Sequence, residues 1–298
     1  MFGSTFTFLA AALVVAGAAP WWPLRLLASV VGGLLLVRGF IIYHDFMHGA
    51  LLRKSRLARG FLFAYGTLVL TPPRVWRQTH NYHHAHTCKI VGSHIGSFPV
   101  LTVDMYRQAS WAQRLLYRIV RHPLTVVIGY LTIFLYGMCV SAFLRRPRGN
   151  WDSGLALLVH VTVAAALAWL FGIEVMLYSF IGPLALACAV GAYLFYAQHN
   201  FEGLHIQPRD AWAFDKAALE SSSYMDLGPV GHYFTGNIGY HHVHHLNPHI
   251  PFYRLPAAHR AVPELQSANV TTLKLRDIAA CFRLKLWDPD QGRMVGYP

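Results

Sequence analysis

Long apolar runs alternate with polar, histidine-rich stretches along this chain. The first two apolar runs cover residues 6–20 and 24–43, and two tryptophans and a proline separate them. Each run approaches the length that a helix needs to cross a bilayer, and the prolines mark a break between two elements. The pattern therefore predicts a helical hairpin at the start of the chain, with its second limb running directly into His44.

Four further apolar runs follow. The run at 60–73 is too short to span a bilayer and predicts a re-entrant or interfacial helix. Three longer runs occupy residues 123–144, 154–172 and 175–198. Only a few residues around Glu174 separate the last two, which predicts a second hairpin.

The arginines decide how the run at 123–144 is interpreted. If it crossed the membrane, the histidines after residue 198 would face the opposite side from those at 80–84. The arginines at 145–148 would then lie outside the cytoplasm, against the positive-inside rule. We therefore predict an all-α integral membrane protein with about four transmembrane helices in two hairpins, two membrane-embedded partial helices and a cytoplasmic histidine-rich cap. The chain shows no repeat or linker, so one domain over residues 1–298 is expected.

Composition supports lipid as the solvent. The 298 residues are 55% hydrophobic and only 13% charged, whereas soluble domains carry about 25% charged residues. The net charge of +12 comes largely from arginines beside apolar stretches, such as Arg118 and Arg121. They accompany no zinc-finger, RNA-recognition or helix-turn-helix motif, so nucleic-acid binding is not expected. The four cysteines are far apart without paired spacing, which argues against disulfides and thiolate metal sites.

Histidine is the anomaly, with 18 residues against 13 acids. Most of the candidates fall in three boxes, HDFMH, HNYHH and HHVHH, whose spacings are i, i+4 or i, i+3, i+4. Such offsets share one face of a helix, so each box can direct several imidazoles to one point. The box histidines on these faces are His44, His48, His80, His83, His84, His241, His244 and His245.

Eight imidazoles are too many for one tetrahedral zinc ion and fit two metal ions better. The acids nearby are few, namely Asp45, Glu202 and Asp226, so a histidine-rich, carboxylate-poor dinuclear site is expected. His199, in YAQHNFE, is a ninth candidate, the alternative being an interfacial or capping residue. His242 lies off the shared face of the third box, and we expect it to support the ligands from outside.

At these residues the sequence resembles the membrane-bound fatty acid desaturases. HDFMHG is similar to their first box and WRQTHNYHHAHT to their second. FTGNIGYHHVHHLNPHIPFYRL and AFDKAALESSSYMDL resemble the third-box region of the acyl-lipid, omega-6 or Δ12-like bacterial and cyanobacterial group. The resemblance runs from about residue 40 to residue 265.

The resemblance implies a di-iron centre that uses O₂ and two electrons to remove two hydrogens from an acyl chain. It implies as metal ligands the eight box histidines together with His199. Some family members hold one iron through a water on an Asn, and Phe195 stands at that place here. Asn237 is our candidate substitute, and with Asp45 and His242 it is predicted to lie just outside the ligand shell.

Electrons must come from a separate protein. The sequence contains no CxxCH haem attachment, no cytochrome b5-like segment and no Gly-rich dinucleotide motif. A small donor, ferredoxin-like because such donors are usually acidic and the cytoplasmic face is basic, is therefore expected. The substrate is expected to be a membrane acyl lipid, and the location a bacterial inner membrane with the active site on the cytoplasmic side.

Two other functions compete with desaturation. An acyl, alkane or carotenoid hydroxylase or ketolase would use the same di-iron scaffold, since the outcome depends on where the substrate carbon sits. A non-catalytic membrane metal-binding or transport protein is the alternative from another class. Transporters usually place ionisable residues at mid-membrane, whereas the box histidines here lie at the ends of the apolar runs. The exceptions are His160 and Glu174, each near the end of a run.

Overall fold

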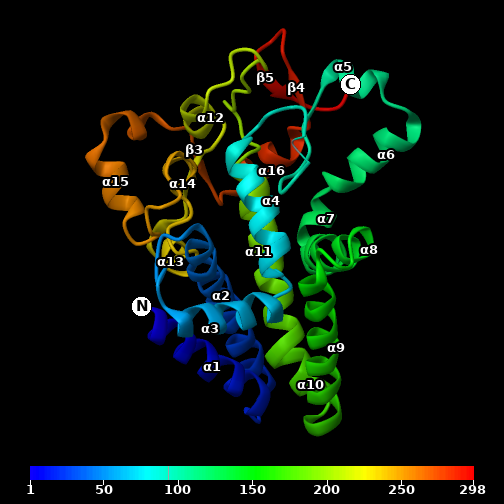
Figure 1. The fold of residues 1–298 in the computed structure, drawn as a ribbon, viewed down its shortest axis with the longest axis vertical. Coiled ribbons are helices and arrows are strands. Elements are labelled where there is room, and N and C mark those ends of the chain that lie inside the picture. Colours follow the sequence, from blue (N-terminus) through cyan, green and yellow to red (C-terminus); the bar gives the residue numbers. More distant parts are fainter. Residues whose placement is uncertain (93) are drawn as a thin grey trace. The chain divides into compact units, whose positions relative to one another are not determined.

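The computed structural model describes residues 1–92 and 94–298, and most of them are helical (Figure 1). The described chain forms two compact units. The first comprises Met1–Arg77, Val127–Ala192 and Phe234–Gly236, and the second comprises Gln78–Val126, Tyr193–Tyr233 and Asn237–Pro298. Helices α4 (Pro73–Ala85) and α11 (Gly182–Ala197) contribute residues to both units.

The first unit begins with the predicted hairpin, α1 (Phe2–Ala18) and α2 (Trp22–His48). Helix α2 has a proline in its first turn, where the missing N–H costs nothing. It ends at Gly49, whose φ of 74° is the left-handed conformation that glycine adopts readily at helix ends. The 27 residues of α2 give a length of about 40 Å, which exceeds the bilayer core.

Three helices are long and apolar enough to cross a membrane among the described residues. They are Trp22–His48, Trp151–Phe171 (α9) and Ile173–Ala197. The last is continuous through α10 (Ile173–Met176), η2 (Leu177–Ile181) and α11. Helix α1, with 17 residues, is shorter, so the fourth span stays a prediction.

Helix packing inside the first unit is close. A Cβ at Gly33 of α2 would lie 2.9 Å from the carbonyl oxygen of Pro183 in α11, so only glycine permits this approach. Helix α9, by contrast, carries large apolar side chains that are exposed, such as Val161 (63% exposed) and Trp169 (84% exposed). Large exposed apolar side chains over a whole helix are rare in water-soluble monomers and fit contact with lipid.

The two runs expected to be partial helices are both helical. The run at 60–73 lies mostly in α3 (Arg56–Leu68), which begins where the Ser55 hydroxyl accepts a hydrogen bond from the Ala58 N–H. The run at 123–144 contains α7 (Pro123–Val127), a π-helix η1 (Tyr130–Ser141) and most of α8 (Ala142–Arg145). Both Phe2–Ala18 and Tyr130–Arg145 are apolar helices of fewer than 18 residues.

The second unit contains short helices and small sheets. Its helices are α5 (Val103–Gln108), α6 (Trp111–Val120), α12 (Phe214–Glu220), all but the last residue of α13 (Gly228–Phe234), α14 (His241–Leu246), α15 (Leu255–Ala261), η3 (Pro263–Ser267) and α16 (Leu275–Arg283). Strand β4 (Leu286–Asp288) pairs in parallel with β1 (Leu101–Thr102) and antiparallel with β5 (Arg293–Val295). Strands β2 (Tyr224–Asp226) and β3 (Val270–Thr272) form a second, parallel pair. The prediction of an all-α chain missed these strands, whose pairing joins distant segments.

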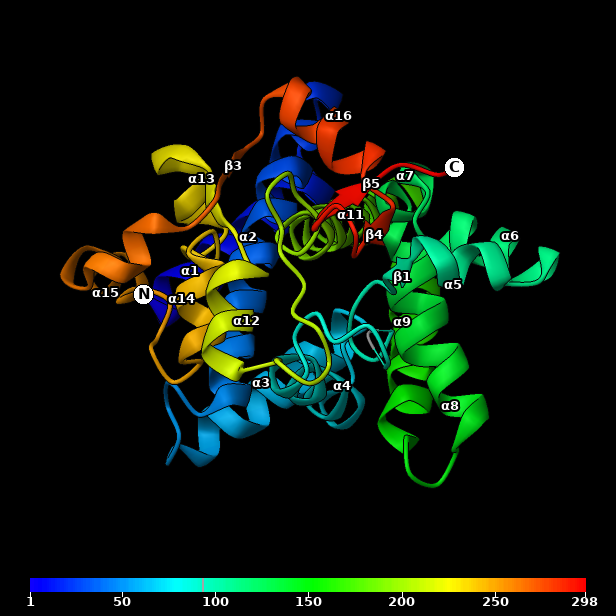
Figure 2. The same ribbon diagram turned by 90° about the horizontal axis from the view of Figure 1, so that it is seen from above.

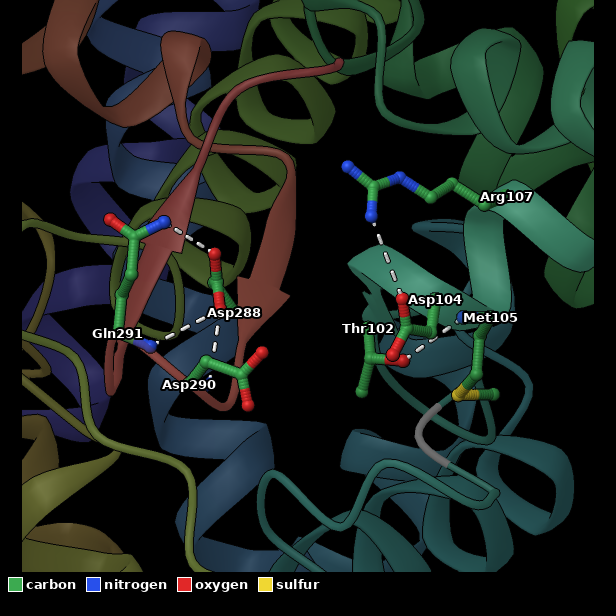
Figure 3. A network of polar contacts seen from close by, with 7 residues as sticks. All are labelled: Thr102, Asp104, Met105, Arg107, Asp288, Asp290 and Gln291. Atoms are coloured by element: carbon green, nitrogen blue, oxygen red, sulfur yellow. Dashed lines mark hydrogen bonds and ion pairs between the residues drawn. The ribbon is translucent and has the colours of Figure 1, made fainter.

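Side chains close the turns at the edge of the first sheet. The Asp288 carboxylate accepts hydrogen bonds from the backbone N–H groups of Asp290 and Gln291 in the β4–β5 turn (Figure 3). Thr102 caps α5 by accepting from the Met105 N–H at 3.1 Å. Viewed from above, α12 and α15 lie beside α14, the helix that carries the third histidine box (Figure 2).

Candidate metal centre

The second and third histidine boxes lie on helices of the second unit. His80, His83 and His84 fall at the end of α4, and α14 consists largely of the third box. The i, i+3, i+4 spacing therefore places each set of imidazoles on one helix face, as the pattern predicts. His199 lies two residues after the end of α11.

Four imidazoles from three segments converge on one point. The Nε2 atom of His199 lies 3.1 Å from that of His83, 3.1 Å from that of His245 and 2.9 Å from that of His241. His245 Nε2 is also within 3.2 Å of His83 Nε2 and 3.1 Å of His241 Nε2. All four side chains are at most 5% exposed. We call His83, His199, His241 and His245 the four-histidine group.

Hydrogen bonding at the far side of His199 shows which nitrogen is free. Its Nδ1 lies 2.8 Å from the carbonyl oxygen of Ser221. A carbonyl oxygen can only accept, so Nδ1 carries the proton and Nε2 presents a lone pair to the centre of the group. Burial lowers the pKa of His199 to about 4, which leaves the imidazole neutral at pH 7 and able to bind a metal.

His245 shares this environment. Burial, followed by the charges of His84, His241, His199 and His83, holds its pKa well below the ordinary value. Its Nδ1 lies 3.0 Å from the hydroxyl oxygen of Thr87. Thr87 is a contact that the box pattern did not identify, because its partner is far away in the sequence.

A second set of histidines lies next to the first. His84 Nε2 lies 3.1 Å from His80 Nε2 and 3.1 Å from His244 Nε2, and all three side chains are buried. We call these residues the three-histidine group. The rings of His84 and His245 stack at 4.2 Å between centroids, so the two groups are neighbours and suit a dinuclear centre.

The first box belongs to the first unit. His44 and His48 project from the end of α2 with their ring centroids 4.7 Å apart. His44 Nδ1 lies 3.0 Å from the Asp45 carboxylate, which places the proton on Nδ1 and the lone pair on Nε2. That His44 and His48 are metal ligands stays a prediction.

The residues predicted to lie outside the ligand shell have defined partners. His242 Nε2 lies 3.0 Å from the Leu265 carbonyl oxygen, and its side chain is fully buried. Asn237 has a φ of 56° and its amide donates to the Phe252 carbonyl oxygen at 3.1 Å. Phe195, which stands where some family members have Asn, places its ring 4.9 Å from that of His83.

The donor set fits a transition metal. Both groups consist of imidazole nitrogens with ligand atoms within 4.8 Å of one another. Imidazole suits iron, copper, nickel and zinc. In the four-histidine group, lone pairs about 3 Å apart would repel one another in a dry interior, and a bound cation removes that repulsion.

Comparison with known proteins decides the family. The sequence model of the fatty acid desaturases matches residues 20–274. The chain belongs to the fatty acid desaturase family. That span includes all three boxes and His199, and family membership makes the chain an oxidoreductase associated with membranes.

Similarity to individual proteins supports the same family. The chain is 34% identical to a fatty acid desaturase of Bacillus subtilis over 92% of this chain and 78% of the relative. It is 27% identical to the sn-1 acyl-lipid omega-3 desaturase (ferredoxin) of Synechocystis, over 78% of this chain and 66% of the relative. It is 24% identical to the sn-1 oleoyl-lipid 12-desaturase of Synechocystis, over 92% of this chain and 78% of the relative.

Proposed function

We propose that this desaturase introduces a carbon–carbon double bond into an acyl chain of a membrane lipid, using O₂ and a di-iron centre. The observation that carries the proposal is the convergence of four buried imidazoles at about 3 Å in a chain of the fatty acid desaturase family. One O₂ takes up two hydrogens from the acyl chain, two electrons and two protons, and leaves as two waters.

The four-histidine group would hold one iron. The three-histidine group would hold the other, together with His44 and His48 of the first box, as the family resemblance implies. When bound, the iron supplies the redox chemistry that an unactivated C–H bond requires and that zinc does not provide.

The protein's own contribution is to bury the ligands and to orient them. The side chains of both groups are at most 6% exposed, and burial favours uncharged imidazole. The Phe195 ring packs on His83, with the ring centroids 4.9 Å apart. A cavity of about 20 Å³ next to it, lined by His83, Phe195 and His199 among others, has room for a water but not for an acyl chain.

Electron supply and membrane placement complete the proposal. The Synechocystis omega-3 relative is named with ferredoxin, and the net charge of +12 favours an acidic partner. We infer a separate ferredoxin-like donor that docks at the cytoplasmic side of a bacterial inner membrane. We further infer four membrane spans, α1, α2, α9 and the helix Ile173–Ala197, with the histidines on the cytoplasmic side.

The test is a fatty-acid profile by gas chromatography–mass spectrometry. A bacterial host expresses the intact chain, His84→Ala or His122→Ala, with a ferredoxin donor supplied. His122 is exposed and lies outside both groups, so it is the matched control. We expect a new unsaturated acyl species with the intact chain and with His122→Ala, and none with His84→Ala. A hydroxylated product, or unchanged turnover in His84→Ala, would contradict the proposal.

A further inference from the structure

Thr87 lies at the junction of the two ligand helices. It follows the second box at the end of α4, and its side chain is buried. The hydroxyl oxygen contacts three groups, namely His245 Nδ1 at 3.0 Å, the His83 carbonyl oxygen at 3.1 Å and the His84 carbonyl oxygen at 3.2 Å. One hydroxyl thus joins the backbone of α4 to a side chain of α14.

The directions of these bonds follow from counting hydrogens. A threonine hydroxyl has one hydrogen, and a carbonyl oxygen can only accept. If the hydroxyl donated to His245, its oxygen would lie 3.1 Å and 3.2 Å from two carbonyl oxygens with no hydrogen between them. We therefore assign its hydrogen to one of the two helix carbonyls, which leaves only lone pairs for His245. The hydrogen between the two side chains must then belong to His245 Nδ1, which donates to the Thr87 oxygen.

This assignment fixes the chemistry of His245. With the proton on Nδ1, its Nε2 carries a lone pair that faces the Nε2 atoms of His83, His199 and His241. The bond also restricts rotation of the ring about χ2. In metal sites, such outer hydrogen bonds orient the ligand and raise its basicity.

We propose that Thr87 is a positioning residue of the metal centre, whose hydroxyl sets the tautomer and orientation of His245. The proposal rests on the proposed function only in requiring that the four-histidine group binds a metal. His199 is held in the same way by the main chain, through the Ser221 carbonyl oxygen. Thr87 is therefore the support that a side-chain substitution can remove.

The position of Thr87 is itself fixed from a third segment. The Trp212 indole N–H donates to the Thr87 carbonyl oxygen at 3.1 Å. The Lys89 ammonium lies 3.6 Å from the centre of the Trp212 ring, a cation–π contact. These contacts hold the backbone of residue 87 independently of its hydroxyl, so a substitution that removes only the hydroxyl should preserve the local fold.

The test compares Thr87→Val, which keeps the shape and loses the hydroxyl, with Thr87→Ser, which keeps the hydroxyl. The full-length chain is purified in detergent, stripped of metal and titrated with cobalt(II) against a chromophoric chelator. Thr67→Val is the matched control, because Thr67 is also buried and bonds a helix carbonyl four residues earlier, that of Phe63. Thermal unfolding of each metal-free variant reports on folding.

We expect Thr87→Val to weaken cobalt affinity by about 10- to 100-fold and to change the visible ligand-field spectrum. Thr87→Ser and Thr67→Val should remain within about threefold of the intact chain, since both leave the bond to His245 in place. Equal affinity in Thr87→Val and the intact chain would overturn the role of Thr87. So would a loss in Thr87→Ser as large as that in Thr87→Val. If the intact chain itself bound no cobalt, the proposed metal centre would fail instead.

Discussion

Arg121 allows a quantitative test of how the second unit is held together. Its side chain is only 1% exposed, although it follows α6 in a basic stretch of sequence. The guanidinium donates to the Pro99 carbonyl oxygen at 2.7 Å and to Asn200 Oδ1 at 2.6 Å. Asn200 in turn donates to the Cys281 carbonyl oxygen at 2.7 Å. The arginine therefore links the end of α6 to the segment after α11 and the C-terminal region.

The size of the effect follows from these two short bonds. Hydrogen bonds to a charged group contribute about 1.5–3 kcal/mol each, so replacing Arg121 by Met forfeits about 3–6 kcal/mol. It also removes the donor from the Pro99 carbonyl oxygen and from Asn200 Oδ1. Removing a buried cation also removes its desolvation penalty, which offsets part of this lost stability. We expect a net loss of about 2–4 kcal/mol, which lowers Tm by roughly 5–15 °C for a unit of this size.

The assay is thermal unfolding of the purified chain in detergent, followed by circular dichroism. Arg114→Met is the matched control, because Arg114 lies on the exposed face of α6 and should change stability by less than about 0.5 kcal/mol. Asn200→Ala should destabilise less in the Arg121→Met background than alone, since the two residues share one bond. A Tm for Arg121→Met equal to that of Arg114→Met would refute the reasoning.

Three further predictions concern charge and membrane placement. Burial and the nearby Arg121 lower the pKa of Lys285 to about 8, so the folded chain binds fewer protons than the unfolded chain between about pH 8 and 10.4. The Tm of the intact chain relative to that of Lys285→Met should therefore rise with pH in that window. A difference in Tm that stays constant with pH would contradict the assignment. Reduction by a ferredoxin-like donor should slow as the salt concentration rises from about 0.1 M to 1 M, because the Debye length falls from about 10 Å to 3 Å. A stopped-flow reduction rate that is independent of ionic strength would argue against docking by charge. Reporter fusions at residue 149 and at the C-terminus should both report a cytoplasmic location, and an outward signal at either would exclude the four-span topology.

The sequence was most informative where a local spacing carried the chemistry. The i, i+3, i+4 pattern predicted that His80, His83 and His84 share a helix face, and it did the same for the third box. Helix geometry alone produces that arrangement, so no tertiary information was needed. The apolar runs predicted the long helices for the same reason, since span length depends only on local composition.

Interactions between distant segments could not be predicted in this way. Thr87 and His245 are separated by 158 residues, and a single threonine carries no signal of such a partner. In the sequence, Arg121 is one of several arginines beside apolar runs, and nothing in the pattern indicates that its side chain is buried against Asn200. The pairing of Leu101 with Leu286 also joins remote segments, and the two residues of β1 are too few for an alternating pattern to be recognised.

Metal content tests the central claim most directly. The chain is reconstituted anaerobically with iron(II), freed of loosely bound metal and analysed by inductively coupled plasma mass spectrometry alongside His241→Ala and His122→Ala. We predict two irons per intact chain, two in His122→Ala, and the loss of about one in His241→Ala, which removes a member of the four-histidine group. One iron or none in the intact chain, or an unchanged content in His241→Ala, would contradict it.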